Sequence, residues 1–292
     1  MINANSREIK VLHLEPTDVC QASCPLCARE TDVNFDRSQK NHLTVDQVLN
    51  HIGRESIQNL DKMFMCGVYG DPAAGRYTLS IYRYFRTMNP EITLGMNTNG
   101  AIQNTAWWQT LGEIFHRQRD YVVFSIDGLE NTNHIYRRGV DWNKLMDNVR
   151  SYISTGASAH WDMLVYGHNE HQVDACEQLA KDLGFSGFRA KISRRQVRAG
   201  LQQPMYWQPL PTMLGPIHCH VLKEKSVYID AQGRLSPCCW LGGRQQDFIT
   251  DIEQVRLTWN SDDPNPVCRD ACGVTHGQTK FHTQWQREIQ LC

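Results

Sequence analysis

The chain has 292 residues, of which 41% are hydrophobic and 21% charged, a composition typical of a globular protein. Its 30 Lys and Arg nearly balance 31 Asp and Glu, which removes the electrostatic case for a nucleic-acid or anionic-membrane partner. No apolar run reaches the roughly 18 residues of a membrane span, and the N-terminal stretch is too polar for a secretory signal. We therefore expect a cytoplasmic protein.

Six apolar runs of strand length alternate with amphipathic stretches in the first two thirds of the chain. The runs cover residues 9–14, 63–68, 92–96, 121–126, 161–166 and 188–192. This alternation predicts an α/β fold with a parallel sheet, curved into a partial (β/α)6 barrel or doubly wound. In both arrangements, functional residues collect at the C-terminal ends of the strands.

The stretches between these runs carry helix signals. Thr44 and Gln47 have the spacing of a capping box. Apolar stripes at helical spacing cover residues 107–115, 142–153 and 173–183. Gly184 is expected to end the third of these helices, and Cys176 to lie on its buried face.

The alternation stops after residue 192. A long connection that contains proline follows, and then a segment rich in cysteine. We expect an α/β unit over residues 1–192, a linker over 193–218, and a small C-terminal domain over 219–292. Within the linker, the basic residues 194–198 are interpreted as a solvated segment rather than an anion contact.

Eleven cysteines are present, and most fall into two clusters. The first cluster contains Cys20, Cys24 and Cys27; the second contains Cys219, Cys238, Cys239, Cys268 and Cys272. An odd number of cysteines without an export signal argues against a disulfide framework. Clustered thiols in a reducing compartment instead indicate metal binding or redox chemistry.

The first cluster has C-x3-C-x2-C spacing in the loop after the first predicted strand. Three thiolates on one short loop can converge on an iron–sulfur cubane, and the fourth iron is then left open for a small molecule. A zinc site is the alternative, because His13 and His42 flank the region.

This spacing and its place after the first strand resemble the radical S-adenosylmethionine (SAM) superfamily. Segments after the next strands look like that family's motifs: Gly70-Asp71-Pro72 like GGEP, Asn97-Thr98-Asn99-Gly100 like TNG, Ser125-Ile126-Asp127-Gly128 like S-x-D-G, and Arg137-Arg138-Gly139 like its Arg-Gly pair. The resemblance implies SAM contacts from Tyr69, Gly70, Asp71, Pro72, Asn97, Asn99, Ser125, Asp127, Arg137 and Arg138. Asp71 replaces the usual Glu, so we expect its contact with SAM to come from the main chain.

The resemblance also implies a reaction. A [4Fe–4S] cluster on Cys20, Cys24 and Cys27 would bind SAM and pass it an electron from a donor of flavodoxin or ferredoxin type. The resulting 5′-deoxyadenosyl radical would abstract a hydrogen from the substrate, while the protein orients the reactants and excludes competing reactions.

The C-terminal cysteines resemble the SPASM and twitch extensions, which hold auxiliary [4Fe–4S] clusters. Cys219 and Cys238 have the C-x13-G-x4-C spacing of those extensions, across a predicted β-hairpin. The central block of a full SPASM domain is absent, which favours one auxiliary cluster with Cys219, Cys238, Cys268 and Cys272 as ligands. Cys239 and Cys292 are competing ligands, and we expect Cys239 to continue the second strand of the hairpin and so to point away from the cluster. A structural zinc is the alternative.

A cluster with four protein ligands has no open site, so it favours electron transfer and a net oxidation. Expected reactions are alcohol dehydrogenation, or formation of a thioether or cross-link within a peptide. About eight residues precede the first strand, so we expect no leader-binding domain there. The expected substrate is a peptide, a protein with a separate recognition partner, or a polar small molecule.

Two other functions stay open at this stage. Cys66, at the end of the second strand, could return a hydrogen atom to a substrate radical, which would make the protein an epimerase or isomerase. Tyr69 and Tyr166 are candidates to line the same pocket. Outside enzymes, the alternative is a zinc-stabilised binding protein.

Overall fold

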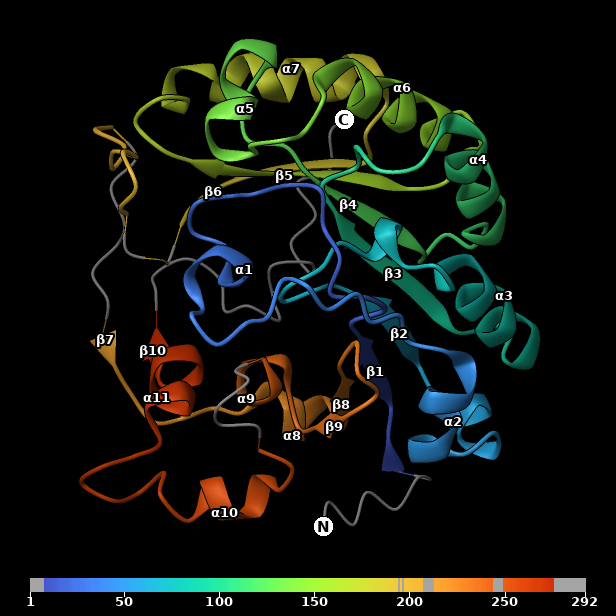
Figure 1. Ribbon diagram of the computed structural model, residues 1–292, viewed down its shortest axis with the longest axis vertical. Helices are drawn as coiled ribbons and strands as arrows, with labels where there is room; N and C mark the ends of the chain where they lie inside the picture. Colours follow the sequence, from blue (N-terminus) through green and yellow to red (C-terminus); the bar gives the residue numbers. More distant parts are fainter. Residues whose placement is uncertain (1–7, 194, 196, 207–212, 244–248, 276–292) are drawn as a thin grey trace.

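The computed structural model describes residues 8–193, 195, 197–206, 213–243 and 249–275. Its largest element is an eight-stranded sheet with the order β6-β5-β4-β3-β2-β1-β8-β9. The strands are β1 (Val11–Leu14), β2 (Lys62–Met65), β3 (Thr93–Thr98), β4 (Tyr121–Ser125), β5 (Ala159–Val165), β6 (Gly187–Ile192), β8 (Ser226–Ile229) and β9 (Leu235–Ser236). The sheet curves, and a row of helices follows its outer side (Figure 1).

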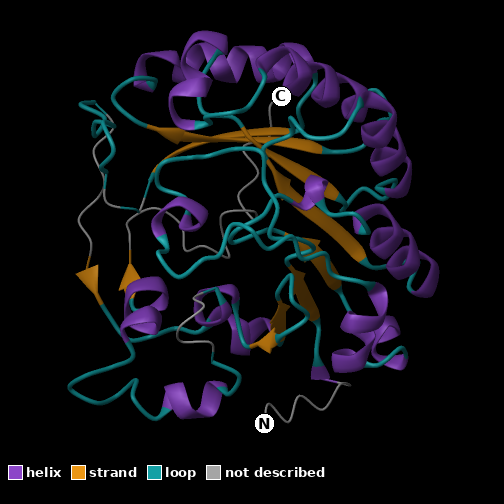
Figure 2. Ribbon diagram, viewed as in Figure 1, coloured by secondary structure: helices purple, strands orange, loops and turns teal. Residues whose placement is uncertain are grey.

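The first six strands are parallel and stand in sequence order, and helices connect them (Figure 2). The connecting elements are α1 (Ala28–Thr31), α2 (Val45–Ile52), η2 (Glu55–Asn59), η3 (Pro72–Ala74), α3 (Thr78–Met88), α4 (Thr105–Ile114), α5 (Glu130–Tyr136), α6 (Trp142–Ile153), η4 (Glu170–Gln172) and α7 (Val173–Leu183). All six predicted strands are present, which confirms an α/β fold with a parallel sheet. The strand order and the curvature fit a partial barrel.

The predicted helix signals are present. Thr44 and Gln47 close the capping box at the start of α2, since each side chain bonds the other residue's backbone. Gly184 ends α7 with a left-handed φ of 83°. Cys176 is fully buried on α7, as its place in the apolar stripe predicts.

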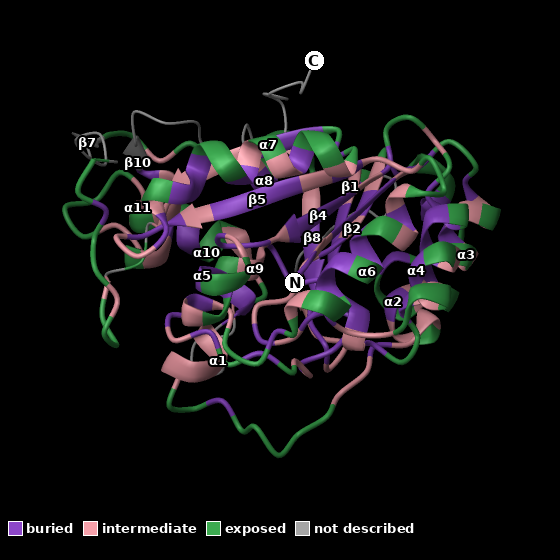
Figure 3. Ribbon diagram, turned by 90° about the horizontal axis from the view of Figure 1, so that it is seen from above, coloured by how far each residue is buried: buried purple, intermediate pink, exposed green. Residues whose placement is uncertain are grey.

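Alternate residues of the strands separate the two faces of the sheet. Leu12, Leu14, Met63 and Met65 are fully buried and belong to the main hydrophobic core, together with the inner faces of the helices. The interior of the sheet is correspondingly buried and the outer helices are partly exposed (Figure 3). On the other face the side chains are aromatic and polar: the ring of His13 stacks on that of Phe64 with centroids 4.3 Å apart.

The C-terminal segment joins the same sheet. Strand β8 pairs in parallel with β1, and β9 pairs antiparallel with β8, which confirms the predicted hairpin. The remaining elements are β7 (Met213–Leu214), α8 (His220–Glu224), α9 (Cys239–Gly242), α10 (Ile252–Arg256), α11 (Pro266–Cys272) and β10 (Val274–Thr275), and β7 pairs with β10. The domain boundaries at 192 and 218 stay a prediction, and Cys292 lies outside the described residues.

None of the helices in the described part of the chain combines the length and the apolar character that a membrane crossing requires.

Candidate active site

The three N-terminal cysteines lie in the loop that leads from β1 to α1. Cys24 is buried, whereas Cys20 and Cys27 are half-buried. The loop is compact because the Cys27 N–H donates to the Cys24 carbonyl at 2.9 Å, and Cys27 is the N-cap residue of α1. The Ser23 N–H donates to the Arg138 carbonyl at 2.9 Å, which attaches this loop to the segment after α5.

The three thiols lie within electrostatic reach of one another. Burial, together with the smaller effects of Asp71, Cys24 and Cys27, raises the pKa of Cys20 to about 12. Burial likewise raises the pKa of Cys24, while Arg137 lowers it in part. Three thiolates this close would repel one another, so a bound cation is what would stabilise their charged forms.

Polar hydrogens are directed at two of these sulfurs. The Asn99 side-chain amide lies 3.7 Å from the Cys20 sulfur, and the Arg137 guanidinium lies 4.0 Å from the Cys24 sulfur. Such donors suit anionic thiolate ligands, so this donor set fits an iron–sulfur cluster. No three His, Cys, Asp or Glu side chains in the described part of the chain are arranged to hold one metal ion. A four-iron cubane spaces its cysteine ligands more widely than a single ion does.

Asp71 uses its carboxylate to hold neighbouring segments together. The side chain is buried, caps η3 through the Ala73 N–H at 2.9 Å, and accepts from the Thr98 hydroxyl at 2.7 Å. It also accepts two bonds of 2.7 Å from Asn99, one from the backbone and one from the side chain. This arrangement joins the segments after β2 and β3, and the expected main-chain contact of Asp71 with SAM stays a prediction.

Gly70 lies at a close approach of two backbones. A Cβ atom at this position would lie 1.9 Å from the carbonyl oxygen of Thr17. No side chain fits there, so the chain can pass beside the cysteine loop only as glycine.

Of the two arginines after α5, Arg137 points into the site. Its side chain is 16% exposed and forms an ion pair with buried Asp127, with Nε and Oδ2 2.6 Å apart. Asp127 also accepts from the Leu164 N–H at 2.6 Å, which attaches the end of β4 to that of β5. Arg138 is exposed. The structure therefore places the side chain of Arg137, rather than that of Arg138, beside the cysteines.

Glu15, directly after β1, was not predicted. It is 1% exposed and accepts from the Tyr69 N–H at 2.7 Å, the Gly70 N–H at 3.0 Å and the hydroxyl of Tyr228 on β8. Burial raises the pKa of Glu15 to about 7. The sequence does show an acidic residue directly after the first predicted strand, where functional residues collect, and this position could have indicated Glu15.

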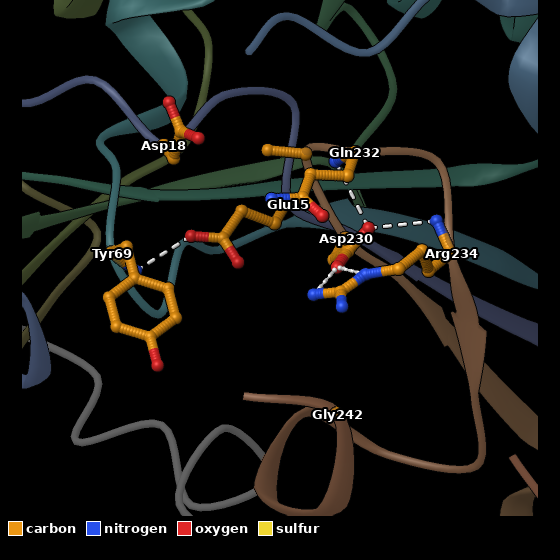
Figure 4. A pocket seen from close by; sticks show the side chains of 8 residues that line it. Glu15, Asp18, Tyr69, Asp230, Gln232, Arg234 and Gly242 are labelled. Carbon is orange, nitrogen blue, oxygen red and sulfur yellow. Dashed lines mark hydrogen bonds and ion pairs between the residues drawn. The ribbon is translucent and has the colours of Figure 1, made fainter. Parts of the chain in front are cut away.

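Glu15 lines a small pocket where the segment after β2 meets the C-terminal hairpin (Figure 4). The lining residues are Glu15, Asp18, Tyr69, Asp230, Ala231, Gln232, Arg234 and Gly242. The Tyr69 hydroxyl donates to the Asp32 carboxylate at 2.6 Å and also contacts the Gly243 carbonyl. Tyr69 thus braces this junction, whereas Tyr166 is buried and stacks on Tyr136 with centroids 4.9 Å apart.

Cys66 follows β2 and continues the polar face of that strand. Burial, together with the neighbouring Glu15 and Asp71, raises the pKa of the Cys66 thiol to about 12, although Lys191 on β6 lowers it in part. Lys191 and Arg189 both pair with the single carboxylate of Asp162 on β5. We did not predict this charged group, although Arg189 and Lys191 are two residues apart in a strand and therefore lie on the same face of the sheet.

Other predicted positions lie nearby. Asn97 and Ser125 are half-buried at the ends of β3 and β4, and Pro72 is buried at the start of η3. Arg195, from the basic segment interpreted as solvated, is exposed but donates to the Leu26 carbonyl at 2.7 Å. Residues 194 and 196 lie outside the described residues.

The C-terminal cysteines converge at a second place. Burial, together with smaller effects of Cys268 and Cys219, raises the pKa of Cys238 to about 11, so these three thiols lie near one another. Cys238 also packs against the small hydrophobic core that contains Cys268. The Cys272 sulfur lies 3.8 Å from Nδ1 of His220, the residue after Cys219.

Two further residues adjoin this group. Cys239 begins helix α9 rather than continuing a strand, and burial raises the pKa of its thiol, with Cys238, Cys66 and Glu15 raising it further. Cys239 therefore lies near Cys66 and Glu15 as well as beside Cys238. Burial also raises the pKa of Cys268, and the indole of Trp259 lowers it in part.

A parallel sheet with a cysteine loop after β1 and joined polar segments after β2, β3 and β4 defines an α/β enzyme that holds its cofactor at the strand ends. Residues 14–180 match the sequence profile of the radical SAM superfamily. This range is more than half of the chain, and the chain belongs to that superfamily. Membership implies SAM and a [4Fe–4S] cluster, and it indicates an enzyme.

Solved structures show the same fold. SuiB from Streptococcus suis bound to S-adenosylmethionine is 13% identical, with a TM-score of 0.56 over 87% of this chain and 66% of that one. SuiB bound to the precursor peptide SuiA is also 13% identical, with a TM-score of 0.57 over 89% of this chain and 66% of that one. AnSMEcpe with bound AdoMet is 18% identical, with a TM-score of 0.50 over 66% of this chain and 52% of that one. The chain thus spans slightly less than two thirds of SuiB, and no match was found among curated proteins.

Proposed function

We propose that this enzyme cleaves SAM reductively and uses the 5′-deoxyadenosyl radical to abstract a hydrogen atom from a peptide. The observation that carries the proposal is the loop of Cys20, Cys24 and Cys27, with Asn99 and Arg137 directed at its sulfurs. A [4Fe–4S] cluster bound there supplies the electron that breaks the sulfonium C–S bond.

The chain's own part is to bind and orient SAM. Arg137 presents a guanidinium that Asp127 holds in place, and a guanidinium matches a carboxylate such as that of SAM. Asp71 fixes Asn99, and Glu15 fixes the backbone of Tyr69 and Gly70. These groups are held before SAM arrives, so binding does not require them to be ordered.

The peptide substrate is supported by the fold shared with SuiB, which has been solved bound to its precursor peptide. A polar small molecule is the other substrate class in this proposal. In both cases a low-potential donor of flavodoxin or ferredoxin type would deliver the electron to the enzyme.

We further propose a twitch-like auxiliary [4Fe–4S] cluster on Cys219, Cys238, Cys268 and Cys272. The electrostatic contact among Cys219, Cys238 and Cys268 supports it. The reaction would then be a net oxidation: the substrate gives a hydrogen atom to the radical, then one electron to the auxiliary cluster and one proton to a base. The substrate is left with a new double bond or cross-link, and SAM is converted to methionine and 5′-deoxyadenosine.

The Cys24→Ala variant tests the first step. Anaerobic enzyme with reconstituted iron and sulfide is incubated with SAM and dithionite, and 5′-deoxyadenosine is measured. We expect the variant to make none, while the control Cys176→Ala, in the core of α7, keeps wild-type activity. Continued formation of 5′-deoxyadenosine by Cys24→Ala would overturn the proposal.

Cys66 supports a second candidate, a redox-neutral epimerase or isomerase. Its pKa of about 12 keeps the thiol protonated, and a hydrogen-atom donor has to be a thiol. Deuterium from heavy water would enter the product and would be lost with Cys66→Ala. An oxidised product without deuterium favours the first candidate.

A further inference from the structure

Trp259 brings a polar hydrogen into the C-terminal core. Its side chain packs against a small hydrophobic cluster of Leu241, Val255 and Cys268, which Cys238 also contacts. The indole nitrogen is buried and makes no hydrogen bond of good geometry among the described residues, although the Cys268 thiol lies within its reach. A buried indole N–H usually finds an acceptor, because it loses its bond to water on burial.

The surroundings of this N–H hold sulfur. Two of the four cysteines proposed to hold the auxiliary cluster, Cys238 and Cys268, belong to or contact the same small core as Trp259. A neutral thiol is a weak acceptor, whereas the thiolates and sulfides of an iron–sulfur cluster are anionic. A bound cluster would supply the acceptor that the indole N–H requires.

We propose that the Trp259 N–H donates a hydrogen bond to a sulfur of the auxiliary cluster and thereby raises its reduction potential. This inference rests on the proposed auxiliary cluster. Hydrogen bonds to the sulfurs are one of the means by which a protein sets such a potential. The donor stabilises the reduced cluster more than the oxidised one, because reduction adds negative charge. Trp259 is thus a positioning residue that makes the cluster a better electron acceptor.

The test compares Trp259→Phe with the control Trp240→Phe in full-length, anaerobically reconstituted enzyme. Phe keeps an aromatic ring and removes the five-membered ring of the indole, with its N–H group; Trp240→Phe makes the same change in size at an exposed position. Trp240 adjoins Cys239 but is exposed, so it has the same residue type near the cluster without the buried donor. Iron is counted first, and the potentials are then measured by redox titration followed by electron paramagnetic resonance.

We expect about eight irons in all three proteins, as for two cubanes. One potential should become more negative in Trp259→Phe, and neither should change in Trp240→Phe. Unchanged potentials with about eight irons would overturn the inference and leave the proposed function intact. About four irons in the wild type would overturn the auxiliary cluster, and this inference with it.

A second measurement covers the case in which Trp259→Phe does not fold. Wild-type enzyme labelled with 15N in its indole rings is reduced, and magnetic coupling between the cluster and an indole nitrogen is recorded. A coupling from one indole supports the hydrogen bond; its absence overturns the inference.

Discussion

Glu15→Gln removes one charge from the centre of the molecule and keeps the shape of the side chain. The amide oxygen of Gln can still accept from the N–H groups of Tyr69 and Gly70, which lie 2.7 and 3.0 Å from the carboxylate oxygen. The amide nitrogen would face the hydroxyl of Tyr228, which can accept as well as donate. The variant therefore tests the charge rather than the contacts.

Burial raises the pKa of Glu15 from 4.5 to about 7. Because the folded pKa lies above the unfolded one, the contribution to stability is fully present below pH 4.5 and is lost as the pH rises through 7. The difference between the two pKa values corresponds to about 3 kcal/mol. Gln does not titrate, so Glu15→Gln should gain up to about 3 kcal/mol relative to wild type between pH 4.5 and pH 8.

Urea unfolding of both proteins at several pH values between 4.5 and 8 measures this difference directly. Other titrating groups contribute equally to both proteins and cancel. The control Glu113→Gln changes an exposed carboxylate on α4 and should follow the wild type at every pH. A difference between Glu15→Gln and wild type that stays constant over this range would refute the reasoning.

Three further predictions follow from the site. Gly70→Ala places a Cβ atom 1.9 Å from the Thr17 carbonyl oxygen, so it should lower the free energy of unfolding by about 1–3 kcal/mol or more and abolish SAM binding in calorimetry. In the control Gly215→Ala the new Cβ atom meets no atom nearer than 4.0 Å, and this variant should bind SAM normally. Arg137→Gln leaves Asp127 buried without its partner and should destabilise the fold by about 3–5 kcal/mol in urea unfolding, against about 0.5 kcal/mol or less for exposed Arg138→Gln; equal losses would contradict the placement of Arg137. Elemental analysis of reconstituted enzyme should give about eight irons and eight sulfides per chain, and about four irons with one zinc would show that the C-terminal cysteines hold zinc.

Local signals in the sequence predict the strands well but not where they end. The apolar run over residues 63–68 predicts a strand to residue 68, yet β2 ends at Met65. The cause is a tight turn, in which a Cβ atom on Gly67 would lie 1.9 Å from the Gly70 carbonyl. Hydropathy reports burial, and these residues stay partly buried after the strand has ended.

The candidate site likewise has a part that the sequence predicts and a part that it does not. The cysteine loop and the segments around Asp71 and Asp127 are short patterns that the sequence displays. Glu15 gains its importance from Tyr228, and Trp259 gains its importance from Cys238 and Cys268 in other segments. Such pairings join residues far apart in the chain, and no local periodicity encodes them.

The pairing of β1 with β8 has a consequence for synthesis on the ribosome. Val11 pairs with Ser226, which follows it by 215 residues. The ribosome adds roughly 5–20 residues per second, so one edge of β1 stays unpaired for roughly 10 to 40 s until β8 has been synthesised. During that interval an unpaired strand edge is open to pairing with other chains, as in aggregation. Nascent chains that stall between residues 192 and 226 should therefore depend on chaperones more than the finished protein does.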